Sequence, residues 1–268
     1  MDIINLQLKA KLIRKSILEM IYLAGSGHPA GALGLTDIFT VLYFDVLKHN
    51  PKKPKLESRD YVIVSNGHIA PVLYGTLAES GYFLKNKLQT LRKLGSKLQG
   101  HPHYNSLPGI ENSSGSLGQG ISIAVGLATS LKRDKKNNLV YCFIGDGELN
   151  EGQIWEALLF ASKENLDNLI IILDRNNIQI DGTTEQVLPL EPLTKKFRSF
   201  NLATIKFDGN NISQIKDAFY HAKKIKKPVI LIAKTISGKG VSFMEGNYIW
   251  HGKVPNKEQY LKAMEELK

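Results

Sequence analysis

Cysteine and long apolar runs are nearly absent from this sequence. Among its 268 residues there is a single cysteine, Cys142, which excludes an intramolecular disulfide framework and a metal site built from cysteines. No apolar stretch approaches the roughly 18 residues that a membrane span requires, and the N-terminus runs from Met-Asp-Ile-Ile-Asn into lysines without the apolar segment of a signal peptide. We therefore expect a cytoplasmic protein with no membrane contact, in which Cys142 is a buried and inert thiol.

Acidic side chains are also fewer than basic ones. The chain has 35 lysines and arginines against 25 aspartates and glutamates, a formal charge of +10. The basic side chains form short clusters, for example around Lys53, Lys196 and Lys224, with no RNA-binding aromatic motif, zinc-finger spacing or long basic arm beside them. Because charge blocks usually face water, we expect no nucleic acid partner and keep nucleic acid binding as a minor alternative. The charge equally suits sugar phosphates or an acidic protein partner.

The rest of the composition suits one globular domain. The apolar content of 43% can supply a core, and 268 residues are enough for one large α/β domain. The sequence contains no internal repeat, low-complexity segment or linker. We therefore expect a single domain over residues 1–268, with a looser loop region at about 81–118.

Two amphipathic helices are predicted near the N-terminus. Apolar residues between Leu8 and Ile21 recur at spacings of three and four, which is the pattern of one helix face. This helix is expected to end near Gly25. A second helical pattern covers about 37–47, with Thr36 as its expected N-cap and Pro51 beyond its end.

Four short apolar runs have the character of buried strands. They lie at residues 61–64, 139–144, 169–173 and 229–233, alternate with helical segments, and each ends in polar residues. Continuous apolar strands that alternate with helices indicate an α/β fold, a parallel sheet with helices on both faces. In such sheets ligands bind beyond the carboxyl ends of the strands, so the polar residues there are the first candidates for a functional site.

The clearest candidate site follows two of these strands. Asp146 lies between Gly145 and Gly147 at one strand end, and Asn176 lies at the end of the next strand. Glycine allows the backbone to approach a diphosphate closely, and neighbouring parallel strands would place Asp146 and Asn176 side by side. Mg2+ takes a few hard oxygen ligands from protein and the rest from phosphate and water. We therefore expect Asp146, Asn176 and the backbone carbonyl of Ile178 to hold a magnesium diphosphate.

Four of the seven histidines occupy tight backbone positions. His28, His68 and His101 directly follow glycine, and His251 directly precedes Gly252. One such histidine would usually be a surface residue, but four at the ends of elements that point to one sheet edge indicate a site. A neutral imidazole both donates and accepts, and its pKa lies near physiological pH, so these residues suit proton transfer.

The segment from Gly145 to Asn177 resembles the thiamine diphosphate motif, which begins Gly-Asp-Gly and ends Asn-Asn. That motif is shared by decarboxylases, 2-oxoacid dehydrogenases, deoxyxylulose-phosphate synthase and transketolase. Further segments resemble transketolase in order and spacing: Ser-Gly-His-Pro at 26–29, Ser-Asn-Gly-His at 65–68, Gly-His-Pro at 100–102, Gly-Ser-Leu-Gly-Gln-Gly at 115–120 and Trp-His-Gly at 250–252. The resemblance covers about residues 24–255, nearly the whole chain.

This resemblance implies a thiamine diphosphate-binding fold and roles for individual residues. It implies thiamine diphosphate with Mg2+ as cofactors, and Ca2+ or Mn2+ could take the place of Mg2+. His28 and His101 would bond the donor sugar, and His68 and His251 would approach the diphosphate and the substrate channel, so that His28, His101 and His251 are the expected catalytic residues. The remaining cofactor contacts would come from Gly115, Ser116, Leu117, Gly145, Asp146, Gly147, Glu151, Asn176 and Ile178, with Glu151 and Glu156 near a subunit contact.

The resemblance also implies a partner chain. In transketolase the glutamate that activates the cofactor's aminopyrimidine ring lies in a second domain, and no segment here resembles that domain. We therefore expect the amino-terminal, diphosphate-binding subunit of a split transketolase. It would transfer a two-carbon ketol unit from a ketose phosphate to an aldose phosphate together with a carboxyl-terminal partner subunit, in a heterotetramer. A fragment of a longer enzyme would have the same sequence features.

Two departures from the transketolase pattern leave the substrate open. His103 stands where many members have glutamate, and Ser116 stands where many have proline. The alternatives are another thiamine enzyme, above all deoxyxylulose-phosphate synthase, or a non-catalytic paralogue that keeps the fold.

Overall fold

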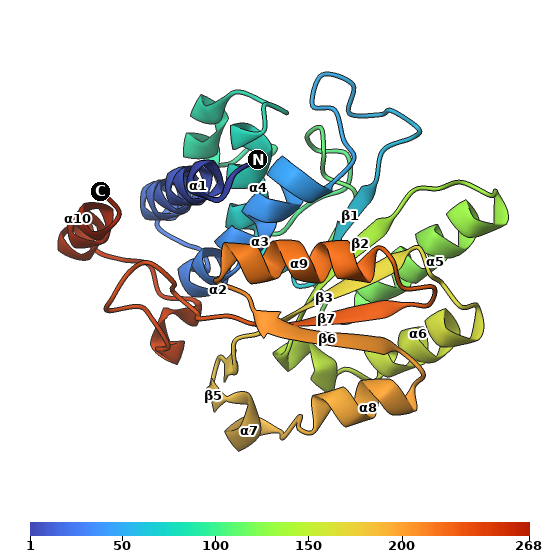
Figure 1. Cartoon of the computed structure of the whole chain (residues 1–268). Coiled ribbons are helices and arrows are strands. Elements are labelled where there is room, and N and C mark those ends of the chain that lie inside the picture. The colour runs from blue at the N-terminus through green and yellow to red at the C-terminus, as the bar shows by residue number, and fades with distance from the viewer.

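A five-stranded parallel sheet forms the centre of the molecule, as a computed structural model of all 268 residues shows (Figure 1). Its strand order is β1-β2-β3-β7-β6, with β1 at Tyr61–Val64, β2 at Val140–Gly145, β3 at Leu169–Arg175, β6 at Ala203–Asp208 and β7 at Val229–Lys234. The predicted α/β class and the four predicted strands are confirmed. The edge strand β6 was not predicted, because Thr204 and Lys206 interrupt its apolar pattern and only Phe207 among its residues is buried.

Helices cover both faces of this sheet (Figure 1). One face carries α1 (Ile3–Ala24), α2 (Pro29–Gly34), α3 (Thr36–Val41), α4 (Ala70–Glu79) and α9 (Ile212–Ala222), and the other carries α5 (Gln119–Arg133), α6 (Gly152–Lys163) and α8 (Leu193–Ser199). Alternate strand residues enter two separate cores: Tyr141 and Phe143 belong to the first, whereas Cys142 and Ile144 belong to the second. Both faces are therefore buried, and Cys142 is a fully buried free thiol as expected.

The N-terminal helices differ in part from the prediction. Helix α1 is confirmed, with Asp2 as its N-cap and Gly25 at its end. The second predicted helix is wrong at its start, because Thr36 is not a cap: α2 begins at Pro29, and the Thr36 hydroxyl donates to the carbonyl of Ala32 at 3.0 Å. After α3 the chain continues as a π-helix over Leu42–Val46.

The segments at the carboxyl ends of the strands are short and irregular. They include the hairpin of β4 (Ile178–Gln179) and β5 (Gly182–Thr183), helix α7 (Thr184–Val187), and 3-10 turns at Gly67–Ile69, Gly147–Asn150 and Tyr248–His251. The predicted loop region 81–118 contains only a 3-10 stretch at Lys85–Thr90. Helix α10 (Lys257–Glu266) returns to α1, where Tyr260 stacks on Tyr22 with 4.2 Å between ring centroids.

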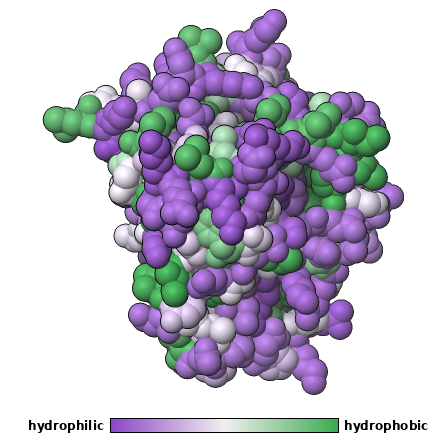
Figure 2. All heavy atoms as spheres, turned by 90° about the vertical axis from the view of Figure 1, so that its left-hand side faces the viewer, coloured by the Kyte–Doolittle hydropathy of each residue, from purple (hydrophilic) through white to green (hydrophobic).

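No helix combines the length and the apolar character needed to cross a bilayer. The side of the molecule on the left of Figure 1, where α2 and β5 lie, is largely hydrophilic with separate apolar patches (Figure 2).

Candidate active site

The structure brings four histidines together from four separate segments. The ring centroid of His28 lies 5.6 Å from that of His68, 6.2 Å from that of His101 and 5.6 Å from that of His251. The rings of His68 and His251 are 5.1 Å apart. His28 precedes α2, His68 follows β1, His101 lies in the 81–118 loop, and His251 ends a 3-10 turn. The predicted convergence on one sheet edge is therefore observed.

These imidazoles are held in their neutral form. Burial lowers the pKa of His28 to about 4, and the neighbouring His251 and Arg92 add to the shift. Burial likewise lowers the pKa of His68 to about 3, with His251 and His28 contributing. The pKa values of His101 and His251 are also lowered, chiefly by burial. Near neutral pH each ring therefore offers one N–H donor and one nitrogen acceptor.

Asp146 and Asn176 lie at the ends of paired strands. Strands β2 and β3 are neighbours with Gly145 opposite Asp174. One carboxylate oxygen of Asp146 accepts from the backbone N–H of Gly147 at 2.9 Å, and the other accepts from the backbone N–H of Asn177 at 2.7 Å. The side-chain oxygen of Asn176 accepts from the N–H of Ile178 at 2.9 Å. These bonds fix the direction of both side chains before any ligand binds.

Asp174 supports the orientation of Asn176. Its carboxylate accepts from the amide Nδ2 of Asn176 at 2.8 Å and from the hydroxyl of Thr235. Burial raises the pKa of Asp174 to about 7, and the nearby Asp146 adds to this shift. Burial also raises the pKa of Asp146 to about 6, although the Asn177 N–H and Arg175 act in the opposite direction. A cation bound beside these two buried carboxyl groups would stabilise their ionised forms.

Arg175 is a neighbour of the candidate metal site that sequence reasoning missed. Its guanidinium lies 3.0 Å from the Asp146 carboxylate and 2.8 Å from that of Glu185, and it also donates to the hydroxyl of Thr184 at 2.6 Å. The Arg175 side chain is only 11% exposed. It therefore joins the end of β3 to α7 and reduces the negative charge around Asp146.

Glu148 was also missed, and it holds the glycine loop in place. Its buried carboxylate accepts from the backbone N–H of Gly118 at 2.7 Å, from that of Gly145 at 3.0 Å, and from the hydroxyl of Ser65. One side chain thus links the end of β1, the end of β2 and the loop before α5. The signal was available in the sequence, since an acidic residue two positions after a strand-end aspartate is an unusual choice for a buried turn.

A cavity of about 310 Å³ connects these groups. Predicted and unpredicted residues share its wall: His28, His68, His101, Gly115, Leu117, Gly145, Asp146, Gly147, Glu148, Asp174, Asn176, Ile178, Gln179, Ile180, Asp181 and His251. Three predicted residues, Ser116, Glu151 and Glu156, lie outside it and are exposed on the surface of the chain.

Several polar atoms near the cavity lack partners within the chain. Both side-chain polar atoms of the fully buried Asn66 are unpaired, as are Nδ1 of His28 and the hydroxyl of Ser114. Buried polar groups are rarely left unpaired without a reason. A bound polar group such as a diphosphate would supply partners, so the residues present fit a diphosphate cofactor with a divalent cation at Asp146 and Asn176.

The chain belongs to the transketolase family, since the family model "Transketolase, thiamine diphosphate binding domain" matches residues 6–267. The chain is 40% identical over 268 residues to one of the subunits of an apulose-4-phosphate transketolase from Phocaeicola vulgatus, with 100% of this chain and 95% of the relative covered. It is 42% identical over 265 residues to the 6-deoxy-6-sulfo-D-fructose transketolase subunit SqwG of Clostridium sp. strain MSTE9, with 98% and 96% covered.

Longer transketolases match the same region. The chain is 36% identical to human transketolase over 259 residues, which is 96% of this chain and 41% of the human protein. The crystal structure of transketolase from Campylobacter jejuni superposes with a TM-score of 0.95 at 38% identity and covers 100% of this chain, which spans 43% of that protein. The transketolase of Leishmania mexicana gives a TM-score of 0.92 at 31% identity, with 98% and 41% covered. The sequence resemblance and the predicted thiamine diphosphate-binding fold are confirmed.

Proposed function

We propose that this chain is the amino-terminal subunit of a split transketolase, which moves a two-carbon ketol unit from a ketose phosphate to an aldose phosphate. The observation that carries the proposal is the single cavity in which the His28, His68, His101 and His251 cluster meets the Asp146 and Asn176 pair. A strand-end carboxylate and amide suit a metal diphosphate, whereas a group of neutral imidazoles suits a polyhydroxylated substrate.

The metal diphosphate would be held by the ends of β2 and β3. We assign Mg2+ to the carboxylate of Asp146, the amide oxygen of Asn176 and the backbone carbonyl of Ile178, with diphosphate and water completing its oxygen ligands. Ca2+ or Mn2+ could replace it, because the ligands are all hard oxygens. Gly145 and Gly147 leave room for the diphosphate, and His68 supplies a neutral hydrogen-bonding group beside it.

Thiamine diphosphate, when bound, supplies the carbon nucleophile that takes up the two-carbon unit. The chain's own residues bind and orient the sugar. His28 and His101, whose rings lie 6.2 Å apart, would bond the donor's carbonyl and first hydroxyl. His251, whose ring lies 5.6 Å from that of His28, would exchange a proton with the substrate, because a neutral imidazole can accept and then return a proton.

The open side of the cavity supports the need for a partner chain. Two apolar side chains of its wall remain exposed, Leu117 at 38% and Ile180 at 72%. Relatives of nearly the same length are named as single subunits of transketolases. We propose that a carboxyl-terminal partner covers this side and supplies the glutamate for the aminopyrimidine ring, in a heterotetramer. The exposed Ser116, Glu151 and Glu156 would then contact the cofactor or partner only in the assembly.

Other features of the proposal rest on sequence. A single domain over residues 1–268, a cytoplasmic location and the absence of nucleic acid partners stay predictions. The identity of the sugar substrate also stays undetermined, since the relatives are named for two different sugars, apulose 4-phosphate and 6-deoxy-6-sulfo-D-fructose.

A product assay separates the proposed reaction from the synthase alternative. The chain with its natural partner, Mg2+ and thiamine diphosphate is given either xylulose 5-phosphate with ribose 5-phosphate, or pyruvate with glyceraldehyde 3-phosphate. Transfer of a two-carbon unit from a ketose supports the proposal. Consumption of pyruvate would overturn it in favour of deoxyxylulose-phosphate synthase, and no turnover with any ketose donor would favour a non-catalytic paralogue.

A further inference from the structure

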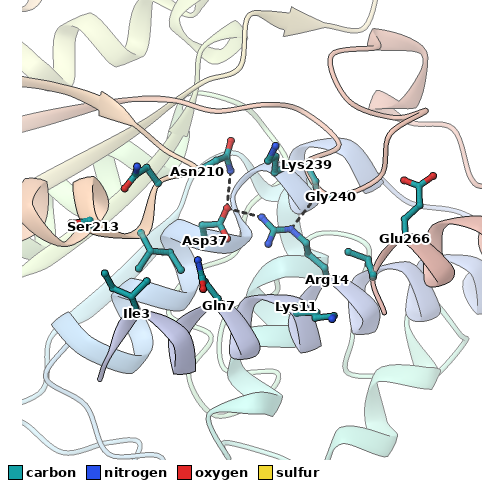
Figure 3. Close-up of a pocket in the computed structure, with 13 residues that line it drawn as sticks. Ile3, Gln7, Lys11, Arg14, Asp37, Asn210, Ser213, Lys239, Gly240 and Glu266 are labelled. Atoms are coloured by element: carbon teal, nitrogen blue, oxygen red, sulfur yellow. Dashed lines mark hydrogen bonds and ion pairs between the residues drawn. The ribbon is translucent and has the colours of Figure 1, made fainter.

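A second and larger cavity lies away from the histidines, between α1, the start of α9 and α10 (Figure 3). Its volume is about 580 Å³, and it shares no wall residue with the histidine cavity. The lining is mainly polar and includes Lys11, Arg14, Asp37, Ser213, Lys239 and Glu266. The function proposed above makes no use of it.

Arg14 is a fixed and nearly buried cation in this cavity. The residue is 8% exposed. Its Nη2 donates to the carboxylate of Asp37 at 2.7 Å, and its Nε donates to the backbone carbonyl of Lys239 at 3.0 Å. Nη1 has no acceptor within the chain and is not sealed from solvent. Because both other nitrogens are held, the guanidinium presents this free donor in one orientation (Figure 3).

The acidic groups of the wall already have donors. The Asp37 oxygen that pairs with Arg14 also accepts from the amide of Asn210 at 3.0 Å. The carboxylate of Glu266 accepts from the hydroxyl of Ser242 at 2.8 Å. Lys11 and Lys239 add two further cations to the wall, of which Lys239 pairs with the carboxylate of Glu245 at 3.2 Å and Lys11 donates to the backbone carbonyl of Lys268. The two carboxylates therefore fix their neighbours in place, and the groups left for a ligand are predominantly donors.

The start of α9 adds backbone donors to the same cavity. Asn211 caps this helix of 11 residues by accepting from the N–H of Gln214 at 3.1 Å. The N–H groups of Ile212 and Ser213 find no acceptor within the chain, and neither does the Ser213 hydroxyl. Free N–H groups at a helix N-terminus carry partial positive charge and bind anions.

We propose that this cavity binds the phosphoryl group of a small phosphorylated metabolite. The donors come from three segments, α1 with Lys11 and Arg14, the start of α9, and the loop after β7 with Lys239, so they suit a tetrahedral dianion that accepts in several directions. A planar carboxylate would satisfy fewer of them. The volume of about 580 Å³ leaves space beside the phosphoryl group for the rest of the metabolite.

Calorimetric titration of the complete chain tests this site. The probes are inorganic phosphate and glycerol 3-phosphate, which has no carbonyl group to react as a ketose, and Mg2+ with thiamine diphosphate is present to fill the other cavity. We expect saturable binding of both probes at one site per chain, with the ester tighter than phosphate. Absence of saturable binding at millimolar concentrations overturns the proposal.

Two double variants locate the site. Lys11→Met with Lys239→Met should weaken glycerol 3-phosphate binding about tenfold, because hydrogen bonds to charged groups are lost. Lys224→Met with Lys226→Met removes two exposed lysines elsewhere and should leave the dissociation constant unchanged. Arg14→Met should abolish binding. If the Arg14→Met variant does not fold, the two double variants still test the site. Equal affinity of both double variants for glycerol 3-phosphate would overturn the proposal.

Discussion

Two glycines on the same helix should respond in opposite ways to alanine. Gly120 lies in the first turn of α5, where an added Cβ would be 2.5 Å from the Cα of Ser65 at the end of β1. Gly126 lies on the same helix with no atom within 4 Å of such a Cβ. The pair therefore separates close packing of α5 on the sheet from the general helix preference of alanine.

The expected magnitudes follow from these distances. Carbon atoms pack best at about 3.5 to 4.0 Å, so Gly120→Ala must push α5 away from Ser65 by about 1 Å. Overpacking of this kind costs about 1–3 kcal/mol, and roughly 2 kcal/mol corresponds to a fall in Tm of roughly 4–8 °C for a chain of this size. Gly126→Ala should instead stabilise the chain by about 0.5–1 kcal/mol, because alanine favours helix over glycine.

Urea denaturation and cofactor titration measure the two effects. Gly120→Ala should also weaken cofactor binding, since Ser65 donates to Glu148, which holds the N–H of Gly118 in the loop that lines the cavity. Gly126→Ala should leave cofactor affinity unchanged. Equal stability of the two variants, or a Gly120→Ala protein with unaltered cofactor affinity, would refute the argument that α5 fits against β1 only through glycine.

The other predictions concern the charged groups of the histidine cavity. Asp146→Ala should abolish divalent-dependent retention of thiamine diphosphate in equilibrium dialysis, and unchanged retention would exclude Asp146 as a ligand. Arg175→Met should tighten Mn2+ binding roughly tenfold by electron paramagnetic resonance, since it removes a cation 3.0 Å from that carboxylate; Arg198→Met is the matched control, and weaker binding would contradict the electrostatic argument. Burial holds the pKa of His68 at about 3 in the folded chain against the ordinary 6.5. Between pH 6.5 and about 3, His68 binds a proton in the unfolded chain but not in the folded chain. Its protonation therefore favours unfolding, and the free energy of unfolding decreases as the pH falls. Thermal unfolding of His68→Gln should show a shallower loss of stability from pH 7 to about 4, and an unchanged slope would mean that His68 titrates normally.

Much of the site could be predicted because its residues follow strands. Once buried apolar runs are assigned to parallel strands, the polar residues after each run must gather at one edge, and Asp146, Asn176 and His68 do so. His251 reaches the same edge from the 3-10 turn Tyr248–His251. The parallel pairing of β2 with β3 confirms the expectation that Asp146 and Asn176 follow neighbouring strands. Their chemical roles stay predictions.

The features that were not predicted depend mainly on contacts that the sequence pattern does not show. Glu148 and Arg175 stand next to predicted site residues in the sequence, but only the fold brings Glu148 to Gly118 and Arg175 to Glu185. The edge strand β6 lacks a continuous apolar run because Thr204, Lys206 and Asp208 alternate with its apolar residues. Thr36 suits a cap by its residue type, but the residues before it already form α2.

Reconstitution with the partner chain tests the central proposal most directly. The chain is purified alone, its co-purifying partner of the native source is isolated separately, and ketol transfer is measured with Mg2+ and thiamine diphosphate as the molar ratio is varied. We expect no transfer by either chain alone and activity that rises to a maximum at an equal ratio. Full ketol transfer by this chain without a partner, or none at any ratio, would contradict the account.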